Sequence, residues 1–459
     1  MFIKNPELVI NPHEPFNEDA FNRKEEIEKL TNILSFIEEP FVLAITSPWG
    51  NGKTKFLEMW RAFIQNKGIN SIYYNAWEND FVVDPLISII GEISSHIEKI
   101  QFNNKTKGKQ ALTRVKKISA TILKRSIPVA TKLISAGIID DKIIAEVISK
   151  TTNDIITEKI KEYEYSKKNI NNFKKELETF VSSLSTDKEI QIPFLIFIDE
   201  LDRCKPGFAI ELLERLKHLF NVRGIVFVLA IDRKQLEKSV ETIFGMDNPD
   251  GYIRKFIDLE YHLIEPDKGD FSNYLIHKLK IEDFVKHIRE GNYQLEDLSD
   301  ITSELFQLFD LKLRQQEQFF SQLVIILKLF PNAGDFHFSY LCLLLILSNY
   351  YREMFLEFSN GEMTGEQLLQ FIESKEGSEK FFESYSACKI EVFLYHFFKD
   401  QSLVSKRIQK YNERKNSASE KSQRPSNIVY LYERLKIMQA EIILKLTVSR
   451  IIYSERYRR

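Results

Sequence analysis

The sequence predicts an α/β fold, in which a parallel sheet flanked by helices carries a helical insertion and is followed by an all-helical C-terminal domain. Two observations support this prediction. Short, continuous apolar runs at 41–46, 194–198 and 224–231 are typical of parallel strands that are buried on both faces. Segments with helical spacing of apolar residues separate these runs, and such alternation is typical of a sheet covered by helices on both sides.

The individual elements follow from the same periodicities. A helix is expected from about residue 19, because Ile27, Leu30, Leu34 and Ile37 recur at helical spacing. The further elements expected are a strand at 41–46, a helix at 53–65, a strand at 71–75, a helix at 85–97, a strand at 194–198, a helix at 208–221, a strand at 224–231 and a last strand at 257–263. Beyond residue 266 the sequence has only helical patterns.

These elements divide the chain into four parts. The sheet domain is expected in two pieces, residues 1–99 and 186–265, separated by a helical insertion at 100–185 and followed by helical residues 266–459. Within the insertion, the dense charges of residues 158–175 predict an exposed helix or a coiled-coil arm. In the C-terminal part, the polar and basic residues 406–425 predict a flexible loop, and residues 428–453 predict a single long helix.

Composition and charge argue against several classes of protein. The 459 residues carry 64 basic and 66 acidic side chains, so no global basic excess indicates nucleic-acid binding. The three cysteines lie far apart without a CxxC pair, so neither a disulfide framework nor a zinc site is predicted. The N-terminus is too polar for a secretory signal, and a cytoplasmic protein is expected. The most apolar stretch, residues 336–351, is shorter than the roughly 20 residues that cross a bilayer, so it predicts a buried helix and no membrane span.

The strongest local signal is the segment SPWGNGKT at residues 47–54, between a predicted strand and a predicted helix. It matches the phosphate-binding pattern G-x-x-x-x-G-K-[ST], except that Ser47 replaces the first glycine. Glycines allow the backbone N–H groups to point at phosphate oxygens, the lysine reaches the β- and γ-phosphates, and the threonine hydroxyl binds Mg²⁺. The residues expected to contact nucleotide are Pro48, Trp49, Gly50, Asn51, Gly52, Lys53, Thr54 and Lys55. The alternative is a glycine turn with a chance GKT sequence.

Two acids at the end of a buried strand argue against that alternative. The run FLIFI at 194–198 is followed directly by Asp199 and Glu200. Buried carboxylates are costly unless they are paired or bind a cation. We therefore expect Asp199 to hold Mg²⁺, together with Thr54, and Glu200 to orient and polarise the attacking water.

Four further residues are weaker candidates. Asp232 ends the strand at 224–231 and could sense the γ-phosphate, although capping of the following helix is an alternative role. Arg203, Arg254 and Arg314 are candidates for an arginine finger or a sensor. For each arginine, the alternative is a surface charge or an ordinary salt bridge.

Together, these residues resemble the KAP family of P-loop NTPases, as a bacterial, soluble member. The resemblance rests on WGNGKT at 49–54, NAW at 75–77, IDELDRC at 198–204, VLAID at 228–232 and DGYIRKFI at 250–257, and covers about residues 15–330. Many members of this family have transmembrane helices between the phosphate loop and the acidic strand, where this chain has the charged residues 100–185. Arg254 also replaces an acidic residue that is commoner in the family.

The resemblance implies a P-loop ATPase that uses ATP and Mg²⁺, with Lys53, Thr54, Asp199 and Glu200 in the roles described above. It implies structural or interface roles for Asp202 and Arg203. It also implies that the segment Asn22–Arg23 lies near the adenine, and that Arg314, in the segment 313–317, is a sensor arginine on a C-terminal helix. Bacterial members are similar to proteins that exclude phage, which implies a role in anti-phage defence.

The function that these features favour is an ATPase that drives a conformational or assembly switch in the helical C-terminal region, as a homo-oligomer or with an effector protein. The alternative is a nucleotide-dependent DNA- or RNA-binding protein, suggested by the lysines within 104–132 and the basic residues 406–424. An inert nucleotide-binding scaffold is less favoured, because it would not need Glu200. A kinase is less favoured again, because no acceptor-site motif is apparent.

Overall fold

The computed structural model describes residues 10–17, 19, 21–82, 84–126, 152–184, 193–265, 267–285, 291–330, 337–415, 422–435 and 437–456. The chain forms two compact units, one spanning Val9–Glu265 and the other Pro266–Arg459 together with the first eight residues. Of the expected insertion at 100–185, residues 127–151 and 185 lie outside the described residues.

The first unit is built on a five-stranded parallel sheet with strand order β2-β3-β4-β1-β5. The strands are β1 (Phe41–Thr46), β2 (Ser71–Asn75), β3 (Phe194–Asp199), β4 (Ile225–Ile231) and β5 (Leu259–His262). The residues after β1 and the acids at the end of β3 therefore lie at the same edge of the sheet. Neighbouring strands are about 4.8 Å apart, so the ends of β1 and β3, with β4 between them, are separated by roughly 10 Å. Open α/β sheets bind their ligands at this carboxyl edge.

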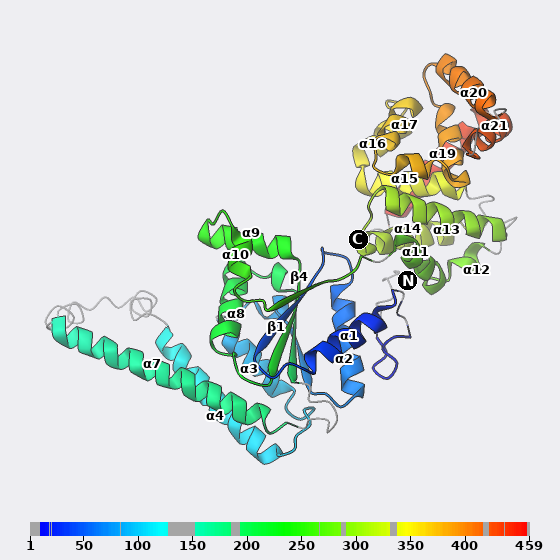
Figure 1. Cartoon of the computed structure of the whole chain (residues 1–459). Helices are drawn as coiled ribbons and strands as arrows, with labels where there is room; N and C mark the ends of the chain where they lie inside the picture. Colours follow the sequence, from blue (N-terminus) through cyan, green and yellow to red (C-terminus); the bar gives the residue numbers. More distant parts are fainter. Residues whose placement is uncertain are drawn as a thin grey trace. The chain divides into compact units, whose positions relative to one another are not determined.

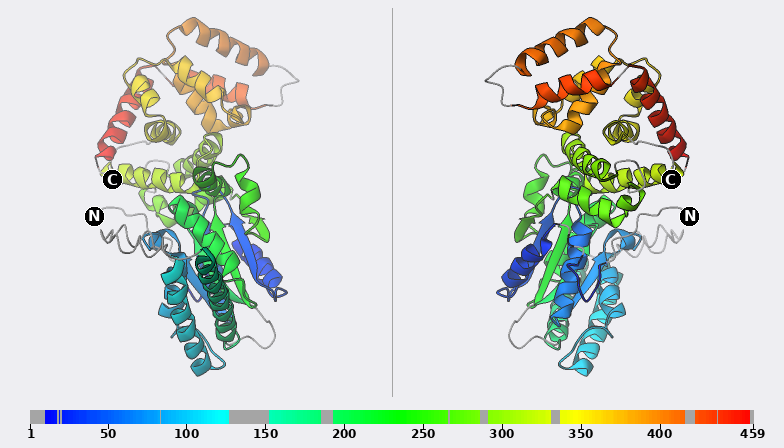
Figure 2. Two further views of the ribbon diagram at one scale, coloured as in Figure 1. Left: turned by 90° about the vertical axis from the view of Figure 1, so that its left-hand side faces the viewer. Right: turned by 90° about the vertical axis from the view of Figure 1, so that its right-hand side faces the viewer.

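The helices of this unit cover both faces of the sheet (Figures 1 and 2). They are α1 (Arg23–Leu34), α2 (Lys53–Asn66), α3 (Pro85–Ser95), α4 (Lys105–Ser126), α7 (Thr152–Val181), α8 (Pro206–His218), α9 (Arg233–Phe244) and α10 (Pro249–Ile253), with single 3₁₀ turns at η1 (Trp77–Asn79) and η2 (Leu201–Arg203). The predicted α/β fold class is confirmed.

Strand β4 shows why the sequence has continuous apolar runs. Its side chains point alternately to the two faces, since successive residues of a strand lie on opposite sides. Val226, Val228 and Ala230 pack in the core beneath α1 and α2. Phe227 and Leu229 pack in the core on the opposite face, which includes residues of α3, α4, α7 and α8. Both faces are buried, so no polar residue interrupts the run.

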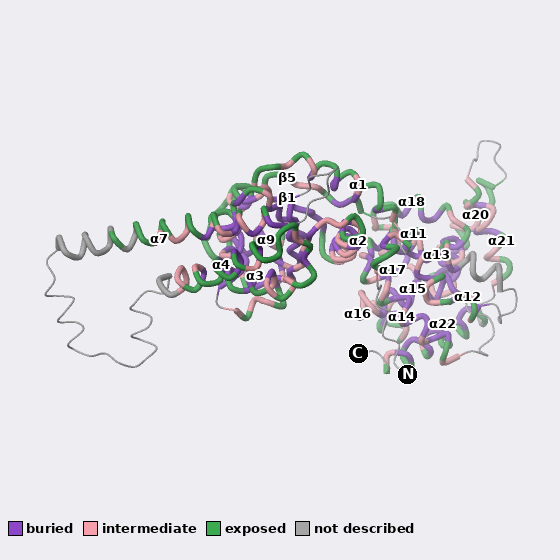
Figure 3. The backbone as a smooth tube through the Cα atoms, turned by 90° about the horizontal axis from the view of Figure 1, so that it is seen from below, coloured by how far each residue is buried: buried purple, intermediate pink, exposed green. Residues whose placement is uncertain are grey.

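Helices α4 and α7 pack against each other as an arm that extends from the sheet (Figure 1). The two helices approach closely near the sheet, where Gly108 of α4 lies against Ser183, which follows α7. A Cβ atom on Gly108 would lie 2.4 Å from the Phe102 ring and 2.5 Å from the Ser183 hydroxyl, so this position has no room for a side chain. Away from the sheet the described part of α7 is largely exposed (Figure 3). The described side chains of residues 161 and 164–175 are mostly exposed, as predicted for this charged helix, and Phe173 is buried.

The second unit is helical over its described residues. Its helices are α11 (Lys268–Lys278), α12 (Ile281–Val285), α13 (Gly291–Leu308), α14 (Leu313–Leu329), α15 (Phe338–Tyr350), α16 (Arg352–Ser359), α17 (Gly365–Glu373), α18 (Ser378–Phe381), α19 (Tyr385–Tyr395), α20 (Gln401–Lys415), α21 (Arg424–Arg434) and α22 (Ile437–Glu455). Helix α15 is buried along nearly its whole length, which confirms the buried helix predicted at 336–351. Among the described residues, no helix combines the length and apolar character needed to span a bilayer.

Two expectations for this unit are wrong. Residues 406–415, expected in a flexible loop, belong to helix α20, and residues 416–421 lie outside the described residues. Tertiary contacts stabilise α20 despite its polar sequence, since Val404 is buried and the Tyr411 hydroxyl donates to Glu391. The single helix expected at 428–453 is two helices, because Leu435 after α21 adopts an extended conformation.

A buried carboxylate joins three helices of the second unit. Glu391 of α19 is fully buried and accepts hydrogen bonds from Arg424 Nη2 of α21 at 2.9 Å and from the Tyr411 hydroxyl of α20 at 3.1 Å. The guanidinium of Arg424 also lies over the Phe382 ring, 4.8 Å from its centroid. Because both charges are largely removed from water, each depends on the other.

We predict that Arg424→Ala destabilises this part of the unit by about 3–5 kcal/mol, because it leaves the Glu391 carboxylate buried without its cation. Hydrogen exchange of the peptides from α19 and α21 measures the change. Lys410→Ala, which removes an exposed cation from α20, is the control and should change protection by less than about 0.5 kcal/mol. Equal protection in the two variants would show that the buried pair is not a stabilising element.

Candidate nucleotide-binding site

The segment between β1 and α2 forms a tight loop at the carboxyl edge of the sheet. Gly50 and Gly52 adopt φ values of 87° and 86°, which favour glycine over residues with a side chain. Helix α2 begins directly after this loop at Lys53, so its first unpaired N–H groups are available to an anion at the same place. Asn51 is buried, and its side-chain amide donates to Glu265 Oε1 at 3.1 Å.

The Lys53 side chain lies under this loop and is only 8% exposed. Its ammonium donates to the carbonyl oxygens of Ser47 at 2.6 Å and of Pro48 at 3.3 Å. Burial lowers the pKa of Lys53, and the negative charges of four carboxylates oppose this shift. These carboxylates belong to Asp202, Asp232, Asp199 and Glu200. The loop lysine and the acids of two other strand ends therefore share one electrostatic environment.

Asp199 is the last residue of β3, and two hydrogen bonds fix its carboxylate. Oδ2 accepts from the Tyr73 hydroxyl of β2 at 2.9 Å, and Oδ1 accepts from the backbone N–H of Glu200 at 2.8 Å. Burial and the adjacent Asp199 charge raise the pKa of Tyr73, so its hydroxyl remains a donor.

A magnesium ion would have a suitable donor set here. The described residues contain no group of three or more His, Cys, Asp or Glu side chains arranged to hold a metal. Mg²⁺ bound with a nucleotide needs only one or two protein donors, because phosphates and water complete its octahedron. Each oxygen of the Asp199 carboxylate keeps acceptor capacity beyond its one hydrogen bond, and Thr54, in the first turn of α2, adds a hydroxyl.

Glu200 follows Asp199 in a left-handed backbone conformation, with φ 61° and ψ 22°. Its side chain is 15% exposed, and its Oε2 atom forms an ion pair of 2.5 Å with Nε of Arg203. Burial raises the pKa of the Glu200 carboxyl, and the positive charge of Arg203 opposes this shift.

Asp202 and Asp232 hold the phosphate loop through Trp49. The backbone N–H of Trp49 donates to Asp232 Oδ2 at 3.1 Å, and its indole N–H donates to Asp202 Oδ2. The same Asp202 oxygen accepts from the backbone N–H of Asp232 at 3.0 Å. Burial raises the pKa of Asp202, whereas Lys53 lowers it.

The capping alternative for Asp232 is therefore not supported. Asp232 precedes α9, but its side chain accepts no hydrogen bond from an amide of that helix. Its carboxylate instead accepts from the loop between β1 and α2.

The remaining candidate residues have other surroundings. Arg254 is 75% exposed and pairs with Asp250 at 2.7 Å. Arg314 is exposed on α14 of the second unit. Lys55 pairs with Glu58 on the same face of α2 at 2.7 Å.

The segment Asn22–Arg23 begins α1. Asn22 has a φ of 56°, and Arg23 is buried, with its guanidinium donating to the carbonyl oxygen of Ile264 at 2.6 Å. Arg23 thus ties the start of α1 to the end of the first unit. Its expected place near the adenine stays a prediction.

Two residues that contact the site were not singled out from the sequence. Tyr73 contacts Asp199 because β2 pairs with β3, and a pairing between strands more than 100 residues apart has no local signal. Glu265 contacts Asn51 at the end of the first unit, where the sequence indicates only a boundary.

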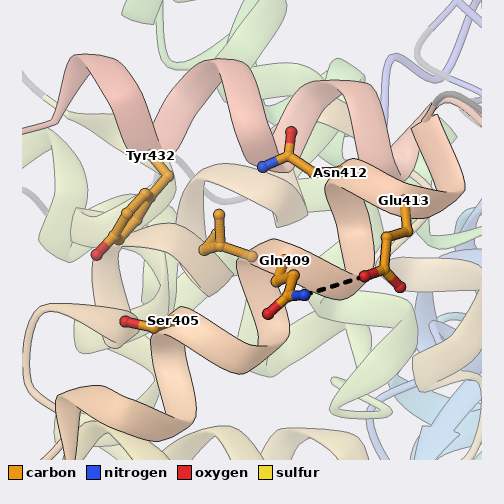
Figure 4. A pocket seen from close by; sticks show the side chains of 6 residues that line it. Ser405, Gln409, Asn412, Glu413 and Tyr432 are labelled. Carbon is orange, nitrogen blue, oxygen red and sulfur yellow. Dashed lines mark hydrogen bonds between the residues drawn. The ribbon is translucent and has the colours of Figure 1, made fainter.

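A further pocket, of about 430 Å³, belongs to the second unit (Figure 4). It is lined by Ser405, Ile408, Gln409, Asn412 and Glu413 of α20 and by Tyr432 of α21. Gln409 donates to Glu413 at 3.2 Å within it. The lining has one acid and no base, nucleophile pair or phosphate-binding loop, so we assign no chemistry to it.

We predict that Asp202→Ala lowers the free energy of unfolding of the first unit by about 2–4 kcal/mol, because it removes the charged acceptor of two hydrogen bonds. Denaturant unfolding followed by tryptophan emission reports this unit, since all three tryptophans lie in it. Asp247→Ala, at an exposed position of the same unit, is the control. Equal stability of the two variants would contradict the assigned role of Asp202.

Comparison with known proteins gives the family of the chain. The model of the KAP family P-loop domain matches residues 23–330. The phage T7 exclusion protein of Escherichia coli (strain K12) is 22% identical over 162 residues, which cover 34% of this chain. The matched stretch spans only 21% of the length of that relative.

Two solved structures align over 97% of both chains, with low sequence identity and low TM-scores. The ORC2 protein of Aeropyrum pernix, solved as ADPNP–ADP complexes, is 11% identical with a TM-score of 0.36. A DNA replication initiation factor is 12% identical with a TM-score of 0.25. We draw nothing from likenesses at these TM-scores. The family match, by contrast, covers about two thirds of the chain, and the chain therefore belongs to the KAP family of P-loop NTPases.

Proposed function

We propose that this protein binds and hydrolyses Mg-ATP and uses the reaction to drive a conformational or assembly switch. The observation that supports this most is the buried ammonium of Lys53, which lies under a glycine loop and in the field of four carboxylates. This arrangement has a lysine and backbone amides for phosphates on one side and acids for a metal and a water on the other. Family membership supports nucleotide binding in general.

Each residue has a role that follows from its position. Lys53 exchanges its hydrogen bonds to the Ser47 and Pro48 carbonyls for oxygens of the β- and γ-phosphates. Thr54 and Asp199 would hold Mg²⁺, which would neutralise charge on the phosphates. Glu200 accepts a proton from the water that attacks the γ-phosphorus, while the bond to the leaving oxygen of ADP breaks.

The linker to the C-terminal helices offers a route for the switch. Asn51 of the phosphate loop is hydrogen bonded to Glu265, the last residue of the first unit, and Arg23 holds the preceding Ile264. A change in the loop on binding phosphate would therefore be passed to Ile264 and Glu265, which directly precede the second unit in the chain. This contact supports a coupling between nucleotide state and the C-terminal helices.

The wider setting of the reaction is part of the proposal. ATP as the nucleotide, action as a homo-oligomer or with an effector protein, and a cytoplasmic site rest on the family resemblance and on the sequence. The similarity to a phage T7 exclusion protein supports a role in anti-phage defence. Arg314 as a sensor and Arg254 as a finger belong to this proposal as well, whereas the contacts of Arg203 favour a role within its own chain.

One observation supports the nucleic-acid alternative. Helix α4 contains eight lysine or arginine residues and no acid. However, Lys105 and Lys109 pair with Glu98, and Arg114 pairs with Glu176, so part of this charge is neutralised. We therefore prefer the ATPase switch. Binding to DNA or RNA that falls steeply with added salt would favour the alternative.

Lys53→Ala should abolish ATP binding, and Glu200→Gln should keep binding but lower kcat by at least about 10²-fold, because it removes the proton acceptor. Omitting Mg²⁺ should abolish hydrolysis in the unaltered protein. Phosphate release and calorimetric titration with ATP measure the two effects. Lys29→Ala and Glu38→Gln, at exposed positions of the same unit, are matched controls. Hydrolysis that persists in both Lys53→Ala and Glu200→Gln would place the active site elsewhere.

Glu265→Ala should weaken the coupling to the C-terminal helices, because it removes the acceptor of the Asn51 amide. The readout is the change in hydrogen exchange of α11–α15 between the ATP-saturated and nucleotide-free states, recorded in a Glu200→Gln background that traps ATP. We expect this change to shrink at least about twofold at full ATP occupancy, the effect of losing one hydrogen bond to a charged group. An undiminished change would exclude this contact as the route.

A further inference from the structure

We infer that Arg203 acts within its own chain as the positioning residue of Glu200, with its guanidinium near the rings of Trp49 and Trp77, and that it is not an arginine finger for a neighbouring copy. This inference rests on the proposed function, in which Glu200 activates the attacking water. It concerns how the water-activating carboxylate is held in place.

The backbone brings Arg203 and Glu200 together. Glu200 has a left-handed conformation, and the single turn η2 that follows returns the chain so that the backbone N–H of Arg203 donates to the Glu200 carbonyl oxygen at 3.1 Å. A residue with a side chain adopts this conformation only at an energetic cost. The ion pair of 2.5 Å between Arg203 Nε and Glu200 Oε2 helps to offset that cost.

Two aromatic rings from separate segments hold the guanidinium of Arg203. Its central carbon lies 5.9 Å from the centroid of the Trp49 ring and 5.7 Å from that of Trp77. A cation within about 6 Å of an aromatic ring centroid is attracted by the electron-rich face of the ring. The guanidinium is planar, so a ring contact fixes its orientation as well as its position. Two indole rings and the Glu200 carboxylate thus lie close to the same guanidinium.

Trp49, one of the two rings near Arg203, belongs to the phosphate loop and is itself held by hydrogen bonds. Its backbone N–H donates to Asp232 and its indole N–H donates to Asp202. A continuous series of contacts therefore runs from the phosphate loop through Trp49 and Arg203 to Glu200.

The surroundings of Arg203 differ from those of a finger. A finger that acts in trans must extend its guanidinium into the site of a neighbouring copy. The Arg203 side chain is only 32% exposed, and its guanidinium contacts a carboxylate and two rings of its own chain. To act in trans it would have to leave all three.

The first test separates positioning from binding. Arg203→Ala should lower kcat at least about tenfold, the loss expected when a proton acceptor is misplaced, while KM for ATP changes less than about threefold. Arg203→Lys keeps the charge without the planar stacking group, and should give an intermediate kcat. Arg223→Ala, which removes an exposed arginine paired with Glu38 and Glu39, is the matched control.

Tryptophan emission gives a second readout that a general loss of fold would not reproduce. Trp49 and Trp77 are 43% and 52% exposed, whereas Trp60 is fully buried. In Arg203→Ala, acrylamide should quench the two exposed tryptophans more strongly, while the blue-shifted emission of Trp60 is kept. Loss of the Trp60 signal would indicate unfolding of Arg203→Ala. The same quenching and kcat measurements on Arg203→Lys then test the inference.

The decisive experiment asks whether Arg203 acts in cis or in trans. Differently tagged Arg203→Ala and Lys53→Ala chains are co-expressed, and any mixed assembly is isolated through both tags. If Arg203 acts in cis, the mixed assembly hydrolyses ATP no faster than the Arg203→Ala chain alone. If no mixed assembly is isolated, kcat of the unaltered protein is measured over a range of protein concentrations, and a kcat that rises as copies associate would contradict action in cis. Recovery of hydrolysis in the mixture would overturn the inference.

The proposed function can fail separately. If the unaltered protein does not hydrolyse ATP, or if Glu200→Gln is fully active, the proposed function is wrong. If Glu200→Gln is inactive and Arg203→Ala matches the unaltered protein in kcat and quenching, only the role of Arg203 is wrong.

Discussion

The carboxyl edge of the sheet depends on the burial of one positive charge, the ammonium of Lys53. A buried cation without partners is strongly unfavourable. Here two loop carbonyls accept its hydrogen bonds, and the carboxylates of Asp199, Glu200, Asp202 and Asp232 supply the opposite charge. These groups come from the ends of three neighbouring strands, β1, β3 and β4, so opposite charges from all three gather at one edge of the sheet.

Hydrogen bonds to the loop keep this volume in a fixed shape. Asp202 and Asp232 both accept from Trp49, and Tyr73 orients Asp199 from the neighbouring strand. Such contacts fix the direction of donors and carboxylates before a ligand arrives, which reduces the reorganisation that binding and reaction require. The ring of Trp49 also lies near the guanidinium of Arg203, which pairs with Glu200.

The family match and the compact units divide the chain differently. The KAP family P-loop domain extends to residue 330, whereas the first compact unit ends at Glu265. The matched region therefore includes helices α11–α14 of the second unit. Those helices follow the residue that contacts Asn51, so the part of the family domain outside the sheet is joined directly to the segment beside the phosphate loop.

The sequence by itself determined the elements that depend on local patterns. The buried strands β1, β3 and β4, the glycine loop before Lys53 and the acids after β3 could be predicted, because strand burial and phosphate binding each require residue types at fixed spacing. Local patterns also indicated where the helical region begins. They failed at α20, a polar segment whose helix is stabilised by contacts of Val404 and Tyr411 with other helices, and at the break after α21, which no glycine or proline marks.

Only the tertiary structure decided which distant residues meet at the site. The strand order places β4 between β1 and β3, and thereby brings Asp232 to the phosphate loop, where its carboxylate accepts from Trp49 and does not cap α9. Strand pairing likewise brings Tyr73 to Asp199, and side-chain packing brings the guanidinium of Arg203 near the rings of two tryptophans. These contacts join residues that are far apart in the chain. They follow from strand pairing and side-chain packing, for which a single sequence carries no local signal.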